Sequence, residues 1–186
     1  MADLVRRIER AQLVPLPVAE AFAFFADAFN LEAITPPWLR FRILTPRPIP
    51  MQQGTVIDYR LTLHRLPVRW RTRIDRWEPR RCFVDRQVDG LFRLWEHTHS
   101  FEERNDGTLI RDSVLYRMPY GVLGTVAHGV LVARDLGRIF DYRRDAVGRV
   151  LGSPGPDSDG LSSRRSSTSS GSERRFPRQA GSSRRG

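Results

Sequence analysis

The strongest constraint on the fold is a period-two alternation of apolar and polar residues in the middle of the chain. The stretch "GTVIDYRLTLH" sets Ile57, Tyr59, Leu61 and Leu63 against polar neighbours, and "VRWRTRIDRW" alternates in the same way. Successive side chains of a strand point to opposite faces of a sheet. Each stretch is therefore predicted to be a strand with one buried face.

More strands are predicted on both sides of these two. The stretch "WLRFRIL" precedes them, and "CFVDRQV", "LFRLWEHTHSFEE" and "TLIRDSVLYRM" follow. The pairs Asp89-Gly90 and Asp106-Gly107 separate the last three stretches. Asp-Gly pairs favour tight hairpins because they tolerate a positive φ. We therefore expect a meander of antiparallel strands.

A strand and a helix are predicted before the meander. Residues 4–14 are expected to form the strand, with Leu13 among its buried positions. Residues 18–29 place several phenylalanines on one side of a helix. Asn30 and the two prolines that follow are expected to end this helix.

A long helix is predicted after the meander, from about Tyr120 to Leu151. Its candidate buried positions include Phe140, Val147 and Val150, and the segment is far too long for a strand. The order is then a strand, one or two short helices, about six strands and a long helix. This order predicts an α+β fold in which a curved antiparallel sheet of about seven strands wraps the C-terminal helix.

The composition changes sharply at Gly152. Residues 153–186 are mostly Ser, Gly, Pro and Arg, and Phe176 is their only aromatic residue. Such a segment buries too little apolar surface to offset the entropy lost on ordering. We therefore expect a ligand-binding domain at 1–152 and a disordered tail at 153–186, which could make weak contacts with acidic partners.

The net charge of +10 raises the question of nucleic-acid binding. The basic residues are all arginines, and in the domain they are spread over strands that also carry Asp and Glu. This distribution does not indicate a specific nucleic-acid site. No apolar run approaches the roughly 20 residues that cross a bilayer, and no secretory signal is evident, so we expect a cytoplasmic protein without a transmembrane segment. The lone Cys82 excludes a disulfide within the chain.

Several longer motifs resemble the SRPBCC or START-like superfamily of helix-grip proteins. They are "VPLPVAEAFAFFADAFNLEAITPPWLRF", "ILTPRPIPMQQGTVIDYRL", "LPVRWRTRIDRWEP", "LFRLWEHTHSFEE" and "GTLIRDSVLYRMPYG". The chain is similar over about residues 3–151 to small bacterial members called cyclase/dehydrase-like, whose ligand is unassigned. The Ser/Arg-rich tail has no counterpart among them. The resemblance implies an internal cavity between the sheet and the C-terminal helix, although a fold alone does not fix the chemistry.

Two histidines lie two positions apart in the stretch "LWEHTHSF". Trp95, His97, His99 and Phe101 share one face of the predicted strand, and the aromatic residues mark that face as the interior one. The histidines could be satisfied by neighbouring polar side chains, or they could contact a ligand in a cavity.

A two-histidine metal site would need a third ligand and a second shell of supporting residues. Asp85 or Asp112 could supply a carboxylate from a neighbouring strand. The strand register that would decide this cannot be derived from residue spacing. We therefore assign no metal and no cofactor from the sequence.

The neighbouring strands extend the same predicted surface. If their inner faces line a cavity, aromatic walls surround a few carboxylates and imidazoles, a composition that suits an amphipathic ring compound. The predicted ligand-contacting residues are Tyr59, Trp70, Asp85, Trp95, His97, His99, Phe101, Asp112 and Tyr116.

Two functions follow from these residues. The first is binding or carrying a small hydrophobic or amphipathic molecule that is lipid-like, aromatic or polyketide-like. The alternative is an enzyme of the polyketide cyclase/dehydratase kind, in which His97, His99 and Asp112 act as acid and base. The sequence contains no nucleophile elbow, phosphate loop or Gly-rich dinucleotide motif, which favours binding over catalysis.

Overall fold

The computed structural model describes residues 5–118 and 122–152, apart from the side chains of residues 122–130. Contacts divide the chain into two units, residues 1–153 and residues 154–186. All the elements described below belong to the first unit. The predicted tail at 153–186 lies outside the described residues. Among the helices that are described, none has the length and apolar character needed to cross a membrane.

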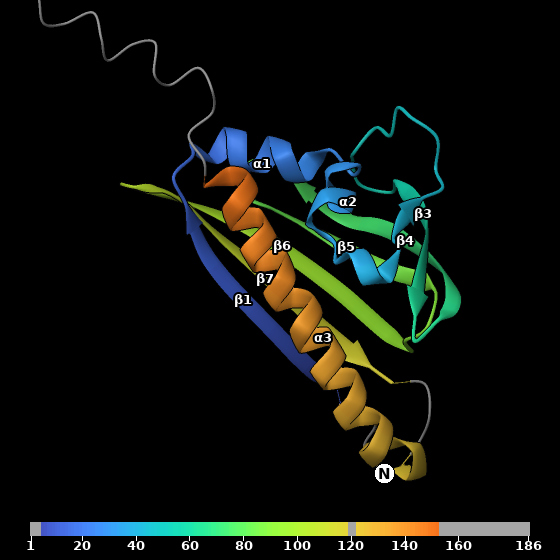
Figure 1. Ribbon diagram of the computed structural model, residues 1–186. Helices are drawn as coiled ribbons and strands as arrows, with labels where there is room; N and C mark the ends of the chain where they lie inside the picture. Colours follow the sequence, from blue (N-terminus) through green and yellow to red (C-terminus); the bar gives the residue numbers. More distant parts are fainter. Residues whose placement is uncertain (1–4, 119–121, 153–186) are drawn as a thin grey trace, which may run out of the picture. The chain divides into compact units, whose positions relative to one another are not determined.

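The described strands form one seven-stranded antiparallel sheet in the order β1-β7-β6-β5-β4-β3-β2 (Figure 1). The first strand of the chain thus pairs with the last. The strands from the second to the seventh pair with one another in the order of the sequence. The strands are β1 (Arg6–Val14), β2 (Arg42–Ile43), β3 (Val56–Leu63), β4 (Leu66–Glu78), β5 (Cys82–Asp89), β6 (Leu94–Arg104) and β7 (Gly107–Arg117).

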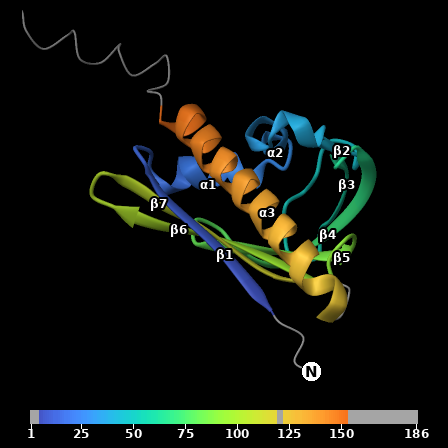
Figure 2. The ribbon, with the colours of Figure 1, turned by 60° about the horizontal axis from the view of Figure 1, so that its bottom comes forward.

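A long helix lies across the inner face of this curved sheet, as Figures 1 and 2 both show. The helices are α1 (Val18–Ala26), α2 (Asn30–Ile34), the 3-10 helix η1 (Pro37–Leu39) and α3 (Val122–Leu151). The Arg10 guanidinium on β1 donates a hydrogen bond of 2.8 Å to Asp141 on α3. This arrangement confirms the predicted helix-grip α+β fold.

The two predicted Asp-Gly hairpins are present, and Gly107 shows why one of them needs glycine. Gly107 begins β7 after the Asn105-Asp106 turn and has a φ of +140°. A Cβ atom at this position would lie 2.0 Å from the carbonyl oxygen of Val14 on β1. Any other residue would therefore push β1 away from the edge of the sheet.

The first helix is shorter than predicted. It ends at Ala26 rather than near Phe29, because Asp27 is extended and its carboxylate accepts a hydrogen bond of 2.9 Å from the Phe29 amide. This side-chain turn competes with helix continuation. Asn30, predicted as a stop, instead begins α2.

The stretch "WLRFRIL" forms less strand than predicted. Pro36 and Pro37 direct the chain into the 3-10 helix η1, which ends at Arg40 in a left-handed conformation with a φ of 42°. Only the two residues of β2 then pair with β3. Leu39 and Phe41 still turn inward relative to the exposed Arg40, as the alternation indicates.

Two predicted core positions are wrong, each by one residue. Leu13 is 47% exposed, whereas its neighbour Val14 is buried, because Val14 shares the inner face of β1 with Ile8. Val150 is exposed and Leu151 is buried at the end of α3. Both segments carry apolar residues at consecutive positions, and the pattern alone did not identify the buried one.

Candidate functional site

A cavity of about 570 Å³ lies between the inner face of the sheet and α3, and it is called the main cavity below. Its size falls within the range of roughly 300–1,000 Å³ that is typical of small-molecule sites. Strands β3 to β6 and helix α3 contribute most of its lining. Its aromatic walls are formed by Phe41, Tyr59, Trp70, Phe92, Trp95 and Phe140.

The structure places six of the nine predicted ligand-contacting residues on the wall of the main cavity. These six are Tyr59, Trp70, Asp85, Trp95, His97 and His99. Phe101, Asp112 and Tyr116 are also buried, but they are not among the lining residues. Phe101 packs instead against Phe22 and Phe25 of α1, and Tyr116 joins an apolar cluster with Trp95 and Phe140.

The register of three neighbouring strands brings the acids and the histidines together. Asp85 on β5 pairs with His97 on β6. Asp112 on β7 pairs with His99 on the other side of β6. Because paired residues of an antiparallel ladder point to the same face, both carboxylates stand beside the imidazoles on the inner face.

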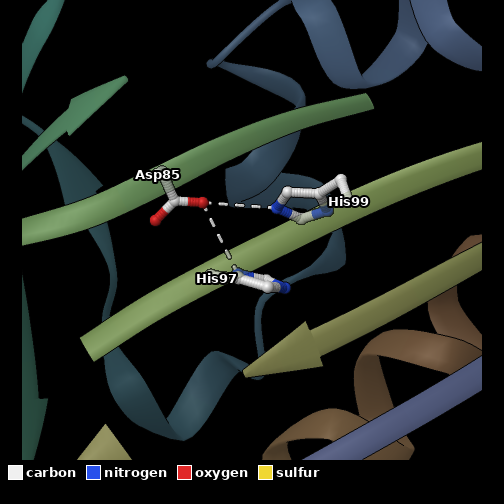
Figure 3. Close-up of side chains that lie close together, drawn as sticks. All are labelled: Asp85, His97 and His99. Atoms are coloured by element: carbon white, nitrogen blue, oxygen red, sulfur yellow. Dashed lines mark ion pairs between the residues drawn. The ribbon is translucent and has the colours of Figure 1, made fainter. Parts of the chain in front are cut away.

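Asp85 faces both imidazoles, as Figure 3 shows. Its Oδ2 atom lies 3.6 Å from Nδ1 of His97 and 3.4 Å from Nε2 of His99. On the other side, Oδ1 of Asp112 lies 2.6 Å from Nδ1 of His99 and 3.5 Å from Nε2 of His97. Each imidazole therefore stands between two carboxylates.

The contacts between Asp112 and the two rings are close approaches of polar atoms rather than aligned hydrogen bonds. Its Oδ1 atom and the facing ring nitrogens, Nε2 of His97 and Nδ1 of His99, are all buried, and none makes a hydrogen bond of good geometry with a described residue. Buried polar atoms are usually satisfied, so three together mark an unusual site.

Sequence reasoning missed a fifth member of this group. Arg143 on α3 is buried, and its Nε atom donates a hydrogen bond of 3.3 Å to Oδ2 of Asp112. Arg143 falls at helical spacing from the buried Leu136, Phe140 and Val147, so a charged residue on an apolar stripe was the available signal. We call Asp85, His97, His99, Asp112 and Arg143 the His–Asp cluster.

The two histidines differ in their affinity for protons. Burial, together with the neighbouring charge of His99, lowers the pKa of His97 below its ordinary value. Burial also acts against charge on His99, but Asp112 and Asp85 outweigh it and raise the pKa of His99. Asp112 is buried as well, yet His99 and Arg143 hold its pKa well below its usual range.

These directions rank the two histidines by proton affinity and favour the ionised form of Asp112. Asp112 is ionised between Arg143 and a His99 that retains its proton more readily than free histidine. His97 is the neutral imidazole of the pair. The floor of the main cavity thus offers both hydrogen-bond donors and acceptors to a bound molecule.

A polar contact lies at another part of the main cavity. His64, in the turn between β3 and β4, lies with its Nε2 atom 2.7 Å from Oδ2 of Asp135 on α3. Both residues line the main cavity, and the His64 side chain is largely exposed. This pair therefore joins the rim of the sheet to the helix where the cavity approaches solvent.

A second, smaller cavity shares part of its lining with the main cavity. It measures about 50 Å³ and is bounded by Phe24, Phe25, Leu31 and Met51. Asp85, His99 and Arg143 line both cavities. Part of the His–Asp cluster thus borders both cavities.

A family model described as polyketide cyclase/dehydrase and lipid transport matches residues 14–138. Among solved structures, the Zhui aromatase/cyclase of a Streptomyces species has a TM-score of 0.55 and 18% identity over 79% of this chain and 96% of that chain. The di-domain ARO/CYC StfQ of the steffimycin biosynthetic pathway has a TM-score of 0.63 and 15% identity, and covers 81% of this chain and 51% of that one.

A plant protein shares the same architecture. Major latex-like protein 151 of Panax ginseng has a TM-score of 0.58 and 10% identity, and covers 80% of this chain and 98% of that chain. At such identities these likenesses show a shared fold and no more. A comparison with curated proteins gives no significant match.

Proposed function

The chain belongs to the polyketide cyclase/dehydrase and lipid transport family, and on that premise we propose that it binds or carries a small hydrophobic or amphipathic molecule in the main cavity. The observation that carries the proposal is a chamber of about 570 Å³ with aromatic walls and one polar floor. Apolar area holds such a ligand, and a few convergent polar groups orient it.

The shape of the lining favours a ring-containing or lipid-like ligand. Trp70 and Trp95 meet edge to face with ring centroids 5.1 Å apart, and Phe92 contacts both. Flat aromatic walls of this kind pack well against rings and alkyl chains. The His–Asp cluster would then face a carbonyl or hydroxyl group on the ligand. A polyketide-like or amphipathic aromatic molecule has both an apolar ring system and such a polar group.

The first test is recovery of a ligand. Native mass spectrometry of the full chain purified from its own cells should detect a bound passenger of low polarity. In parallel, an apolar fluorescent dye should bind the emptied protein and be displaced by the extracted passenger. Protein that carries no passenger and binds no apolar dye would contradict the proposal.

A matched pair of variants locates the site. Leu61 on β3 lines the main cavity, whereas its neighbour Arg60 points away from it and is exposed. Leu61→Trp should fill part of the cavity and abolish dye binding, and Arg60→Trp should leave dye binding unchanged. Equal binding by both variants would place the ligand elsewhere.

The second candidate function is a cyclase or dehydratase, and one observation favours it. His97 and His99 line the main cavity beside the carboxylates of Asp85 and Asp112, so they can reach a bound carbonyl compound. A double variant, His97→Gln with His99→Gln, should abolish conversion of a polyketide-like substrate if the protein is an enzyme. If it is a carrier, the same variant should alter affinity and no turnover should be found in the parent protein.

A further inference from the structure

The three residues drawn in Figure 3 lie close together, and their side chains are of types that can bind a metal ion. Asp85, His97 and His99 each offer one ligand atom, and these atoms lie within 4.8 Å of one another. Two imidazoles and one carboxylate are a ligand set that suits zinc and other divalent transition metals. We propose that Asp85, His97 and His99 form a binding site for a divalent transition-metal ion of the zinc type.

The distances suit four-coordinate binding. Oδ2 of Asp85 is 3.4 Å from Nε2 of His99 and 3.6 Å from Nδ1 of His97. With metal–ligand bonds of about 2.1 Å, the edge of a tetrahedron measures about 3.4 Å. The carboxylate is therefore already placed relative to both rings, and rotation of the histidine side chains can adjust the distance between the two nitrogens.

A supporting carboxylate stands behind the ligands. Histidines that bind a metal usually direct the other ring nitrogen to a carboxylate, which fixes the orientation of the ring. Here those nitrogens are Nε2 of His97 and Nδ1 of His99, and both face Oδ1 of Asp112, at 3.5 Å and 2.6 Å. These two nitrogens and that oxygen are buried, and each lacks an aligned hydrogen bond to a described residue.

Arg143 completes this second layer. It donates to the other oxygen of Asp112, so Asp112 is held from two sides and is directed toward the rings. Asp85 and His99 line both cavities, and His97 lines the larger one. A fourth ligand to the metal would therefore come from a cavity, either as water or as an oxygen atom of a bound molecule.

Metal binding is tested with Co²⁺ and Zn²⁺ alone, on the full chain without a histidine tag. After removal of metal with a chelator, one equivalent of Co²⁺ should produce the strong visible absorption of a four-coordinate ion. Asp85→Asn should weaken Co²⁺ binding about tenfold or more. Asp89→Asn, an exposed carboxylate on the same strand, and His64→Gln, outside the cluster, should leave the affinity unchanged.

Two results would overturn the site. One is the pale spectrum of six-coordinate Co²⁺ in the parent protein, and the other is equal affinity in the parent and in Asp85→Asn. If Asp85→Asn does not fold, NMR of the parent protein decides. Zn²⁺ should shift the imidazole resonances of His97 and His99 but not those of His64, and shifts at all three or at none would disprove the proposal. An apolar passenger can bind without a metal. A negative result for metal binding would therefore leave the carrier function standing, and a negative result for ligand binding would leave the metal site standing.

Discussion

Arg143 and Asp112 form a buried ion pair between the long helix and the sheet, with Nε of the arginine 3.3 Å from Oδ2 of the aspartate. Their side chains are only 10% and 9% exposed. Separating the members of a buried pair leaves a charge without its partner, which is more costly than replacing both together.

Arg143→Met should therefore destabilise the fold. We expect a loss of about 3 kcal/mol in the free energy of unfolding, measured by urea denaturation. Arg144→Met serves as the control, because Arg144 is exposed and pairs with Asp145 beside it. This variant should lose no more than about 0.5 kcal/mol in the free energy of unfolding. Equal losses in the two variants would show that the buried pair is not important for stability.

The contact between His64 and Asp135 should control how quickly a ligand leaves the main cavity. Asp135→Asn removes the charge from a partly exposed pair, so we expect dissociation of an apolar dye to accelerate about two- to fivefold. Stopped-flow fluorescence measures this rate. Asp141→Asn, on the same helix and not among the cavity-lining residues, should leave it unchanged. An unaltered rate in Asp135→Asn would show that ligands pass by another route.

The hydrogen bond from Arg10 to Asp141 should make a small, pH-dependent contribution to stability. The hydrogen bond from Arg10 lowers the pKa of the Asp141 carboxyl group below its ordinary value. A depressed pKa means that the contribution is present above the unfolded-state pKa and is lost as the pH falls through the folded-state pKa.

Asp141→Asn should thus reduce the free energy of unfolding at neutral pH by less than about 1 kcal/mol, because the pair is partly exposed. The difference from the parent protein should vanish in acid below the folded-state pKa. Urea denaturation over a pH series checks both points. A difference that persists or grows in acid would contradict the assignment.

Two glycines should respond to alanine in opposite directions. At Gly107 a methyl group would collide with the Val14 carbonyl on a backbone of positive φ, so Gly107→Ala should lower the free energy of unfolding by more than about 1 kcal/mol. At Gly137 on α3 nothing lies within 4 Å of the added Cβ. Gly137→Ala should stabilise the protein by about 0.5–1 kcal/mol. Thermal and urea unfolding of the two variants test this, and a destabilised Gly137→Ala would be the contrary result.

The sequence was sufficient to predict which face of β6 is buried. Trp95, His97, His99 and Phe101 all point inward, because alternation along a strand depends only on local backbone geometry. The hairpins and the long helix were also predictable, because their sequence signals act over a few neighbouring residues. The end of α1 was not, since the Asp27 side chain competes with the helical pattern over only a few residues.

The composition of the cluster required tertiary structure. The opposition of Asp85 to His97, and of Asp112 to His99, depends on the register between strands, which spacing along the chain does not encode. Arg143 lies 31 residues from Asp112 in sequence, although its place on the apolar stripe of α3 was visible. Local patterns therefore revealed the candidate residues, and the sheet determined how they meet.

The alternation along β6 limits which changes of sequence can alter the chemistry of the cavity during evolution. The positions between the buried ones hold Glu96, Thr98 and Ser100, which face the other side of the sheet. Insertion or loss of one residue in this strand would turn these three inward and send both imidazoles outward. Relatives with different ligands should therefore diverge by replacing single side chains at His97 and His99, while the length of this strand stays constant.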